Sequence, residues 1–196
     1  MKNKPEDIED IQLIRSFRNG NTVAFNTLFI RWHDKIYRFA FRFFADPDEA
    51  MEITQKTFIK VYHKMDTLDD DRKFSSWIYR IANNLCLDEL KRAGRRRSVS
   101  LDEWTEPKIT LETDTPQEEL EEFELKELLQ RALLAIPKEQ RTVIILKEFE
   151  ELTFREISEI LDEPENTVKS RMYYGLSALR KIFKKWNIKK GILNYE

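Results

Sequence analysis

The side chains best suited to recognising a ligand are basic, hydroxyl and aromatic groups gathered at positions 169–174. Groups of these types contact phosphates and base edges in the major groove of DNA. They face away from an apolar series at helical spacing, which consists of Val168, Met172, Leu176 and Leu179. The pattern therefore favours a helix that reads DNA. A helical hairpin with a solvated basic face has the same local pattern and stays open as the alternative.

A second apolar series precedes this helix, also at helical spacing, and consists of Phe154, Ile157 and Leu161. The segment 162–164 interrupts it, because proline lacks an amide donor and keeps the residue before it out of the helical conformation. Asn166 or Thr167 is expected to cap the following helix with a side-chain oxygen. Two helices joined by a tight turn predict a helix-turn-helix over about 153–181.

Another group of polar and aromatic side chains lies on one side of a helix expected from Phe74 to Arg97, with Ser75 or Ser76 as its cap. This group consists of Trp77, Arg80, Asn84, Asp88 and Lys91. Rings beside basic and amide groups suit single-stranded or melted nucleic acid, because bases stack on rings and phosphates pair with cations. A tryptophan near a helix start belongs to the core about as often, so that interpretation stays open.

A helix is also expected after Pro47, with Asp48 and Glu49 in its first turn, where the helix dipole favours negative charge. Its buried stripe is expected to consist of Ala50, Ile53, Thr54, Thr57, Phe58 and Val61. A different side carries Glu52, Gln55, Ile59 and Tyr62. This mixture of acidic, amide and apolar groups suits a protein-binding surface, and a solvated face explains it equally well.

The composition predicts an all-α fold, because 36% of the 196 residues are charged and only four are glycine. Further helices are expected at 8–19, 22–45, 118–134 and 138–150. The length suits two small helical domains, at 1–97 and 118–196. Between them, residues 98–117 lose apolar periodicity and are rich in acid, which predicts a flexible linker.

Several function classes have little support in the sequence. Cys86 is the single cysteine, so no internal disulfide is expected, and no signal peptide or membrane span is apparent; a soluble, cytoplasmic protein is expected. The net charge of −2 argues neither for nor against nucleic acid. No catalytic motif or glycine-rich phosphate loop is present, so an enzyme, a cofactor or a bound metal is not expected. The acidic run 69–71 lacks the spacing of a calcium loop and is interpreted as a turn.

Two other interpretations remain. The N-terminal helices could sense a ligand in a one-component transcriptional regulator that uses the same helix-turn-helix on an operator. His33 and Asp34 are similar to the metal-binding pair of some phosphohydrolases, although no further ligands are spaced convincingly around them.

The motifs taken together resemble the extracytoplasmic-function class of bacterial sigma factors, which are two-domain members of the sigma-70 family. The N-terminal match is DEAMEITQKTFIKVY followed by FSSWIYRIANNLCLDELKR. The C-terminal match is IPKEQRTVIIL with LTFREISEILDEPENTVKSRMYYGLSALRK. Two motifs in the family's order and at the family's separation are more specific than either alone. The resemblance covers nearly all of the chain except its ends and the linker.

The resemblance implies a role for each group of residues. Those expected to dock on core RNA polymerase are Asp48, Glu52, Gln55, Phe58 and Ile59. Those expected to capture and open the minus-10 element, with the turn 68–73, are Phe74, Trp77, Arg80, Asn84, Asp88, Lys91 and Arg92. Those expected to read the minus-35 element are Arg155, Thr167, Lys169, Ser170, Arg171, Tyr173 and Tyr174. Base capture fits the chemistry, because an unstacked base leaves its Watson–Crick edge free for an amide such as Asn84.

The resemblance also implies partners: the clamp of the β′ subunit and the flap of the β subunit of polymerase, promoter DNA, and an anti-sigma factor, possibly membrane-anchored. It implies a stress or cell-envelope regulon, no small-molecule substrate, and an acidic linker that threads toward the polymerase active centre. Three positions depart from the family pattern. Asn166 replaces a glycine, Tyr174 stands where many members carry arginine, and Gly175 costs its helix about 1 kcal/mol relative to alanine.

Overall fold

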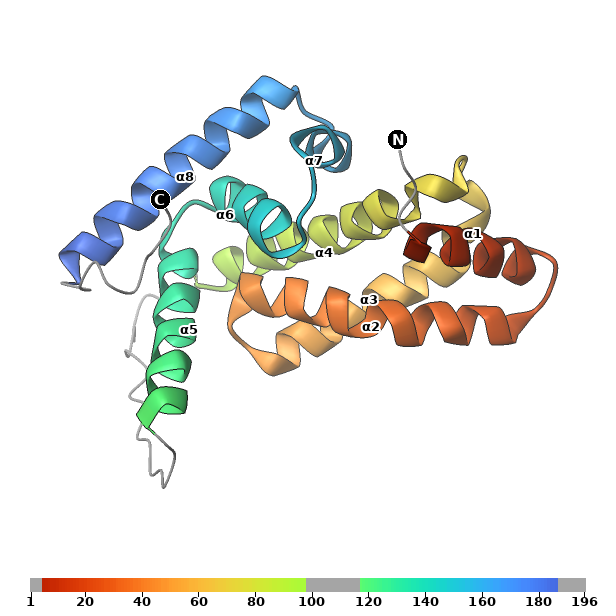
Figure 1. Ribbon diagram of the computed structural model, residues 1–196, viewed down its shortest axis with the longest axis horizontal. Helices are drawn as coiled ribbons and strands as arrows, with labels where there is room; N and C mark the ends of the chain where they lie inside the picture. The colour runs from red at the N-terminus through yellow and green to blue at the C-terminus, as the bar shows by residue number, and fades with distance from the viewer. Residues whose placement is uncertain (1–4, 98–116, 187–196) are drawn as a thin grey trace.

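The computed structural model describes residues 5–97 and 117–186, and within these two ranges it contains helices and no strand (Figure 1). In chain order the helices are α1 (Pro5–Arg18), α2 (Thr22–Phe44), α3 (Pro47–Lys64), α4 (Phe74–Arg97), α5 (Gln117–Ala135), α6 (Lys138–Ile144), α7 (Phe154–Leu161) and α8 (Glu165–Lys185). The predicted all-α fold class is confirmed. The linker prediction falls mostly on residues 98–116, which lie outside the described residues. No helix in the described ranges is long and apolar enough to cross a bilayer.

Aromatic side chains form the core of the bundle made by α1 to α4. The Trp32 ring meets Phe74 edge to face, with centroids 5.5 Å apart, and meets Tyr79 at 5.8 Å. The Trp32 indole N–H donates to Asp10 over 2.9 Å, and Asp10 also pairs with Arg31. The indole therefore fills apolar space while its one donor is satisfied.

Local capping residues set the starts of the N-terminal helices. Asn21 caps α2, because its side chain accepts from the amide of Val23. Asp46 caps α3 in the same way. The prediction that Ser75 or Ser76 caps α4 is wrong. A short 3₁₀ turn (Asp71–Lys73), capped by Asp70, runs directly into α4 and places both serines inside the helix.

The C-terminal helices place α8 across α6 and α7 (Figure 1). After α6 the chain widens into a π-helical turn (Ile145–Phe149) before the loop to α7. The prediction that Leu176 belongs to the apolar stripe of α8 is wrong, since Leu176 is exposed and the neighbouring Gly175 is buried. A Cβ on Gly175 would lie 2.7 Å from Cδ1 of Ile144, so glycine allows α8 to approach α6 closely.

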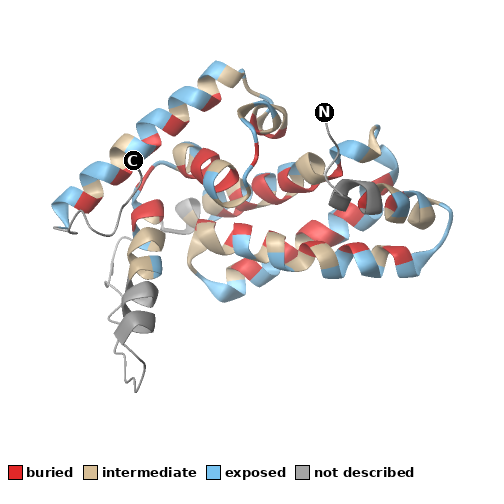
Figure 2. Cartoon of the chain, in the orientation of Figure 1, coloured by how far each residue is buried: buried red, intermediate tan, exposed pale blue. Residues whose placement is uncertain are grey.

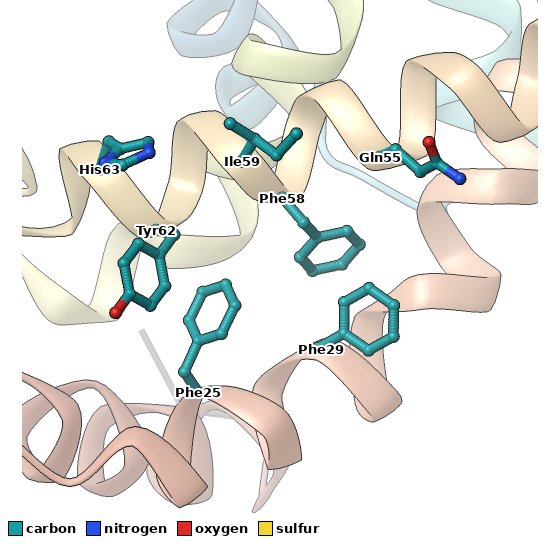
Figure 3. Close-up of a pocket in the computed structure, with 7 residues that line it drawn as sticks. All are labelled: Phe25, Phe29, Gln55, Phe58, Ile59, Tyr62 and His63. Carbon is teal, nitrogen blue, oxygen red and sulfur yellow. The ribbon is translucent and has the colours of Figure 1, made fainter.

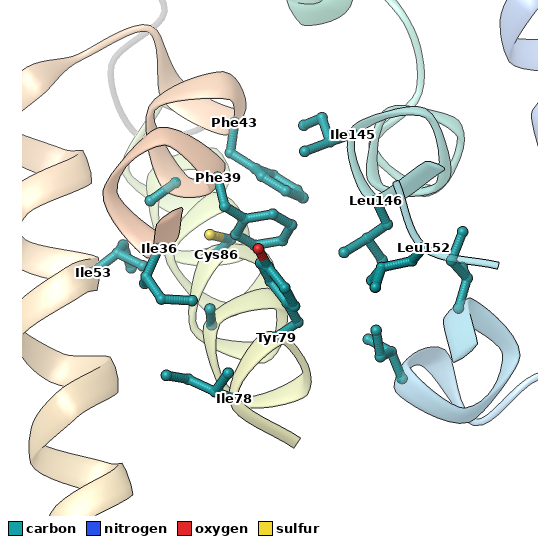
Figure 4. Close-up of a cluster of buried hydrophobic side chains, with 14 of the residues drawn as sticks. Ile36, Phe39, Phe43, Ile53, Ile78, Tyr79, Cys86, Ile145, Leu146 and Leu152 are labelled. Carbon is teal, nitrogen blue, oxygen red and sulfur yellow. The ribbon is translucent and has the colours of Figure 1, made fainter. Parts of the chain in front are cut away.

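The buried cores of the two helical groups are continuous. Phe39, Phe43 and Tyr79 from α2 and α4 face Ile145 and Leu146 from the π-helical turn (Figure 4). Helix α4 packs on α2 and α3 and also on α7, and buried positions recur along it (Figure 2). In this arrangement the C-terminal helices lie against part of α4.

Candidate nucleic-acid interface

The predicted helix-turn-helix is present. Thr153 and Glu156 form a capping box at the start of α7, with the Thr153 hydroxyl 3.2 Å from the Glu156 amide. Asp162 adopts the left-handed conformation and ends α7. The expected cap at Asn166 or Thr167 is wrong. Helix α8 begins earlier, and the Pro164 carbonyl accepts from the amide of Thr167, which places both residues in the first turn.

The outer side of α8 carries two exposed tyrosines. Tyr173 is 71% exposed and Tyr174 is 61% exposed, with ring centroids 5.6 Å apart. Lys169 and Ser170 are exposed one turn earlier. This surface combines hydroxyl and ammonium donors with aromatic faces, so it can meet both phosphates and the edges of bases.

Acidic neighbours hold three of the basic residues predicted to contact the minus-35 element. Lys169 Nζ lies 2.6 Å from Glu165, and Arg155 Nε lies 3.8 Å from Glu159. Both of these pairs are four residues apart on one helix and largely exposed, so they exchange easily with solvent or phosphate. The half-buried Arg171 instead spans the turn and donates to Glu163 over 2.8 Å. In this conformation Arg171 holds α7 and α8 together.

The residues predicted to capture the minus-10 element lie along α4, but they differ in exposure. Arg80, Asn84, Asp88, Lys91 and Arg92 are exposed, while Trp77 is half-buried and packs on the core. Phe74 is only 2% exposed, so it supports the fold of α4 and could reach a base only if it moved. Between α4 and the helix-turn-helix is a polar cleft of about 320 Å³, lined partly by Asn84, Lys91 and Arg171. The cleft brings residues of the two predicted promoter surfaces together.

The predicted polymerase-docking side of α3 borders an apolar groove of about 420 Å³ (Figure 3). Of the predicted residues, Asp48, Glu52, Gln55 and Ile59 are exposed, and Phe58 is mostly buried under the groove. The periodic pattern of α3 did not predict the other wall of the groove. That wall comes from α2, where Phe25 and Phe29 face Phe58 and Tyr62; the signal was an aromatic at every fourth position of α2.

A buried carboxylate joins the two helical groups, and the sequence analysis did not identify it. Glu150 accepts a hydrogen bond from the Tyr79 hydroxyl of α4 and lies 3.5 Å from the Arg42 guanidinium of α2. Burial raises the pKa of Glu150, although Tyr79 and Arg42 act in the opposite direction. Arg42 also lies over the Phe149 ring, 4.2 Å from its centroid. These contacts link α2 and α4 to the end of the π-helical turn.

A buried arginine makes the second link. Arg141 of α6 donates to the carbonyls of Leu133 and Leu134 at 2.8 Å, which satisfies the end of α5. The same guanidinium donates to the Phe43 carbonyl at the end of α2 over 2.7 Å. Burial lowers the pKa of Arg141, but a guanidinium stays charged at any physiological pH. A basic residue just before the apolar run 143–146 was the signal in the sequence.

The alternative of a metal site at His33 and Asp34 gains no further ligand in the described part of the chain. His33 Nδ1 lies 3.0 Å from Asp34, and among the residues that the structure describes no three His, Cys, Asp or Glu side chains are placed to hold a metal ion. The described residues thus form two surfaces predicted to bind nucleic acid, on α4 and α8, and one apolar groove between α2 and α3. This combination is typical of a transcription protein with two binding regions.

Comparisons with known proteins identify the class. Residues 28–96 match the family model of sigma-70 region 2, and residues 126–179 match sigma-70 region 4. The chain is 36% identical to the ECF RNA polymerase sigma factor SigW of Bacillus subtilis, over 86% of this chain and 93% of the relative. It is 30% identical to the RNA polymerase sigma-H factor of Pseudomonas aeruginosa, over 88% and 93% of the two chains.

Solved structures agree on the fold. CnrH in complex with the cytosolic domain of CnrY has a TM-score of 0.67 at 21% identity, covering 90% of this chain and 98% of that chain. The sigma factor RpoE in complex with the anti-sigma factor NepR from Bartonella quintana has a TM-score of 0.65 at 21% identity, covering 82% and 96%.

The chain belongs to the extracytoplasmic-function class of the sigma-70 family, as its resemblance implied. It is therefore a promoter-specificity subunit of bacterial RNA polymerase, and it is a transcription initiation factor, not an enzyme. The hydrolase interpretation is wrong for this reason.

Proposed function

We propose that this sigma factor reads the minus-35 element with the outer side of α8 and captures the minus-10 element with α4. Exposure of Tyr173, Tyr174, Lys169 and Ser170 on one side of α8 is the observation that carries this proposal. Apolar rings beside hydroxyl groups suit contacts with thymine methyl groups and base edges, and Lys169 supplies a phosphate contact. In this proposal residues 1–97 and 118–196 are the two working domains and 98–117 connects them.

The apolar groove between α2 and α3 is the proposed docking site for the clamp of the β′ subunit. Ile59 and the Tyr62 ring give it an exposed apolar rim, and Asp48 and Glu52 extend an acidic row along the same helix. An apolar centre with charged residues at its edge is the usual composition of a protein interface. The C-terminal helices are proposed to contact the flap of the β subunit.

An anti-sigma factor is the proposed inhibitor, and the protein is proposed to act in the cytoplasm on a stress or cell-envelope regulon. The support is that CnrH is solved with the cytosolic domain of CnrY and RpoE with the anti-sigma factor NepR, both on the fold of this chain. A membrane anchor on the inhibitor would couple its release to an external signal.

Transcription in vitro tests the proposal directly. The full chain, added to core RNA polymerase on a library of genomic fragments, is expected to start transcription at promoters that core polymerase ignores. Trp77→Ala and Asn84→Ala are expected to slow promoter opening by at least tenfold and to change duplex binding much less. Asn26→Ala, an exposed amide on α2, is the control. Equal losses at both steps would contradict the role of α4.

Salt dependence tests the assignment of α8. Lys169→Ala is expected to weaken binding to the minus-35 duplex and to lower the slope of log affinity against log salt by about one, because one phosphate contact is lost. Lys60→Ala removes the same charge from the exposed side of α3 and is expected to change neither quantity. An unchanged slope in Lys169→Ala would show that Lys169 makes no phosphate contact in the interface.

A further inference from the structure

Two basic residues of the predicted minus-10 surface already bind an acidic residue inside this molecule. Lys73, just before α4, lies with its Nζ 3.0 Å from Oε2 of Glu159 on α7. Arg80 on α4 donates to the backbone carbonyl of the same Glu159. The first helix of the helix-turn-helix therefore lies against the surface that the proposed function assigns to melted DNA.

Glu159 also binds a basic residue of the predicted minus-35 surface. Its other carboxylate oxygen, Oε1, lies 3.8 Å from Nε of Arg155 on the same helix. One carboxylate thus contacts a cation from each promoter surface. Two oxygens that share a negative charge between an ammonium and a guanidinium resemble the unesterified oxygens of a DNA phosphate.

We propose that Glu159 takes the place of a DNA phosphate in the free protein, so that the sigma factor's own helix-turn-helix covers Lys73 and Arg80 until polymerase and promoter separate the two domains. This inference rests on the proposed role of α4. It adds that the minus-10 surface is closed by the chain itself, before any inhibitor binds.

Two sets of contacts join the two domains, and they differ in strength. The Lys73–Glu159 pair is more than a third exposed on both sides, and such pairs contribute about 0.2–1 kcal/mol. It cannot hold the domains together. The apolar contact of Phe43 and Tyr79 with Leu146, together with the buried hydrogen bonds of Arg141 and Glu150, holds the closed arrangement. Glu159 is then the residue that a strand of DNA must displace from Lys73 and Arg80.

Binding of single-stranded DNA by the full chain tests this division. The probe is a fluorescein-labelled non-template strand from a promoter that the holoenzyme uses, followed by fluorescence anisotropy. Glu159→Gln is expected to bind the probe up to about fivefold more tightly than the natural chain, which is the factor that loss of one exposed ion pair allows. Glu148→Gln removes the same charge from an exposed position on the π-helical turn and is the matched control.

A reversible cross-link tests closure independently. Lys73→Cys combined with Glu159→Cys is joined by a cleavable bis-maleimide. The native Cys86 is fully buried and burial raises its pKa, so the reagent is directed to the introduced thiols. The cross-linked chain is expected to lose at least tenfold in affinity for the strand and to stop transcribing with core polymerase. Cleavage of the linker is expected to return both to the level of the same double variant before cross-linking.

The outcomes separate the two proposals. If the natural chain transcribes with core polymerase, but Glu159→Gln binds the strand no better than Glu148→Gln, the phosphate-replacement role is overturned while the proposed function stands. If the cross-linked chain binds the strand as tightly as the cleaved chain, closure over α4 is overturned. If the natural chain transcribes no promoter with core polymerase, the role of α4 and the inference that rests on it both fall.

Discussion

Two buried ionisable side chains, Arg141 and Glu150, join the two halves of the molecule, and each is satisfied in a different way. Arg141 uses its fork of N–H donors on backbone carbonyls. Glu150 accepts from Tyr79 and lies beside Arg42. Burial of a charge is costly unless hydrogen bonds replace the lost water, so the loss of either side chain should have a measurable effect.

Arg141→Ala is expected to lower the free energy of unfolding by at least about 3 kcal/mol, because several buried carbonyls lose a charged donor at once. Urea denaturation followed by circular dichroism measures the change. Arg131→Ala is the control, since Arg131 is exposed and pairs only with Glu127 one turn away; its loss should stay within about 0.5 kcal/mol. Comparable losses in the two variants would mean that the buried hydrogen bonds contribute little.

Glu150→Gln is expected to change how stability depends on pH. Burial raises the pKa of Glu150 in the folded protein, so the folded state takes up a proton there at a pH where the unfolded chain is still ionised. The stability of the natural chain relative to Glu150→Gln should therefore rise as the pH falls through the raised folded-state pKa, and level off below the ordinary carboxyl pKa of about 4.3.

Unfolding midpoints in urea at several pH values measure this difference. With Glu148→Gln as the reference instead, the natural chain should show no comparable rise, because Glu148 is exposed. A stability difference between the natural chain and Glu150→Gln that stays constant with pH would show that Glu150 is exposed to solvent in solution.

At the scale of the helices, α8 and α4 each pack with one side and carry the predicted recognition residues on another. The inner side of α8 packs through Val168, Met172 and Leu179, which leaves its aromatic and hydroxyl side chains outside. Helix α4 buries Ile78 and Ala82 and turns Arg80 and Asn84 toward the C-terminal helices. Close packing at Gly175 sets how deeply α8 lies on α6, and therefore where the recognition residues stand.

Gly175→Ala is expected to destabilise the C-terminal helices by about 1 kcal/mol. Alanine gains about 1 kcal/mol in helix propensity, but its Cβ would overlap Cδ1 of Ile144, and such overpacking costs about 1–3 kcal/mol. Ile144→Val removes that atom. The alanine change should therefore be stabilising in the Ile144→Val background, which a double-mutant cycle in urea measures. The same loss in both backgrounds would place the strain elsewhere.

For the whole molecule, the main feature is that the two domains share one core. The groove between α2 and α3 remains open (Figure 3), while Arg80 on the α4 surface already binds the backbone of Glu159. In the proposed function, polymerase engages the groove first, and contact with the promoter then requires the C-terminal helices to leave α4.

Ile59→Asp is expected to weaken the affinity for core polymerase by at least about tenfold, because it places a charge on the apolar rim of the proposed docking groove. Ile59 is 58% exposed, so the free energy of unfolding should change by no more than about 0.5 kcal/mol. Ile30→Asp is the control, because Ile30 is exposed on α2 but does not line the groove. Binding is measured by displacement of a labelled chain from polymerase; similar losses in the two variants would argue against the groove.

By itself the sequence was sufficient for the helices, the family and the helix-turn-helix. These depend on apolar spacing and on residues that break or cap helices within a few positions of one another. The Asn21 cap and the turn after α7 follow from such local preferences. The failed predictions at Ser75, Asn166 and Leu176 are also local, and in each case a neighbouring turn or helix decided between adjacent positions.

Only the tertiary structure decided which surfaces are free. The sequence predicts Phe74 and Trp77 as base-binding residues, yet Phe74 is buried in the core and Trp77 is half-buried. The aromatic side chains of α2 form a wall of the groove that the pattern of α3 did not predict. The links through Arg141, Glu150 and Glu159 join residues more than seventy positions apart. Spacing along one helix tells which side is apolar, but a contact between distant helices depends on how all of them pack, so only the folded chain could show that the two promoter surfaces meet.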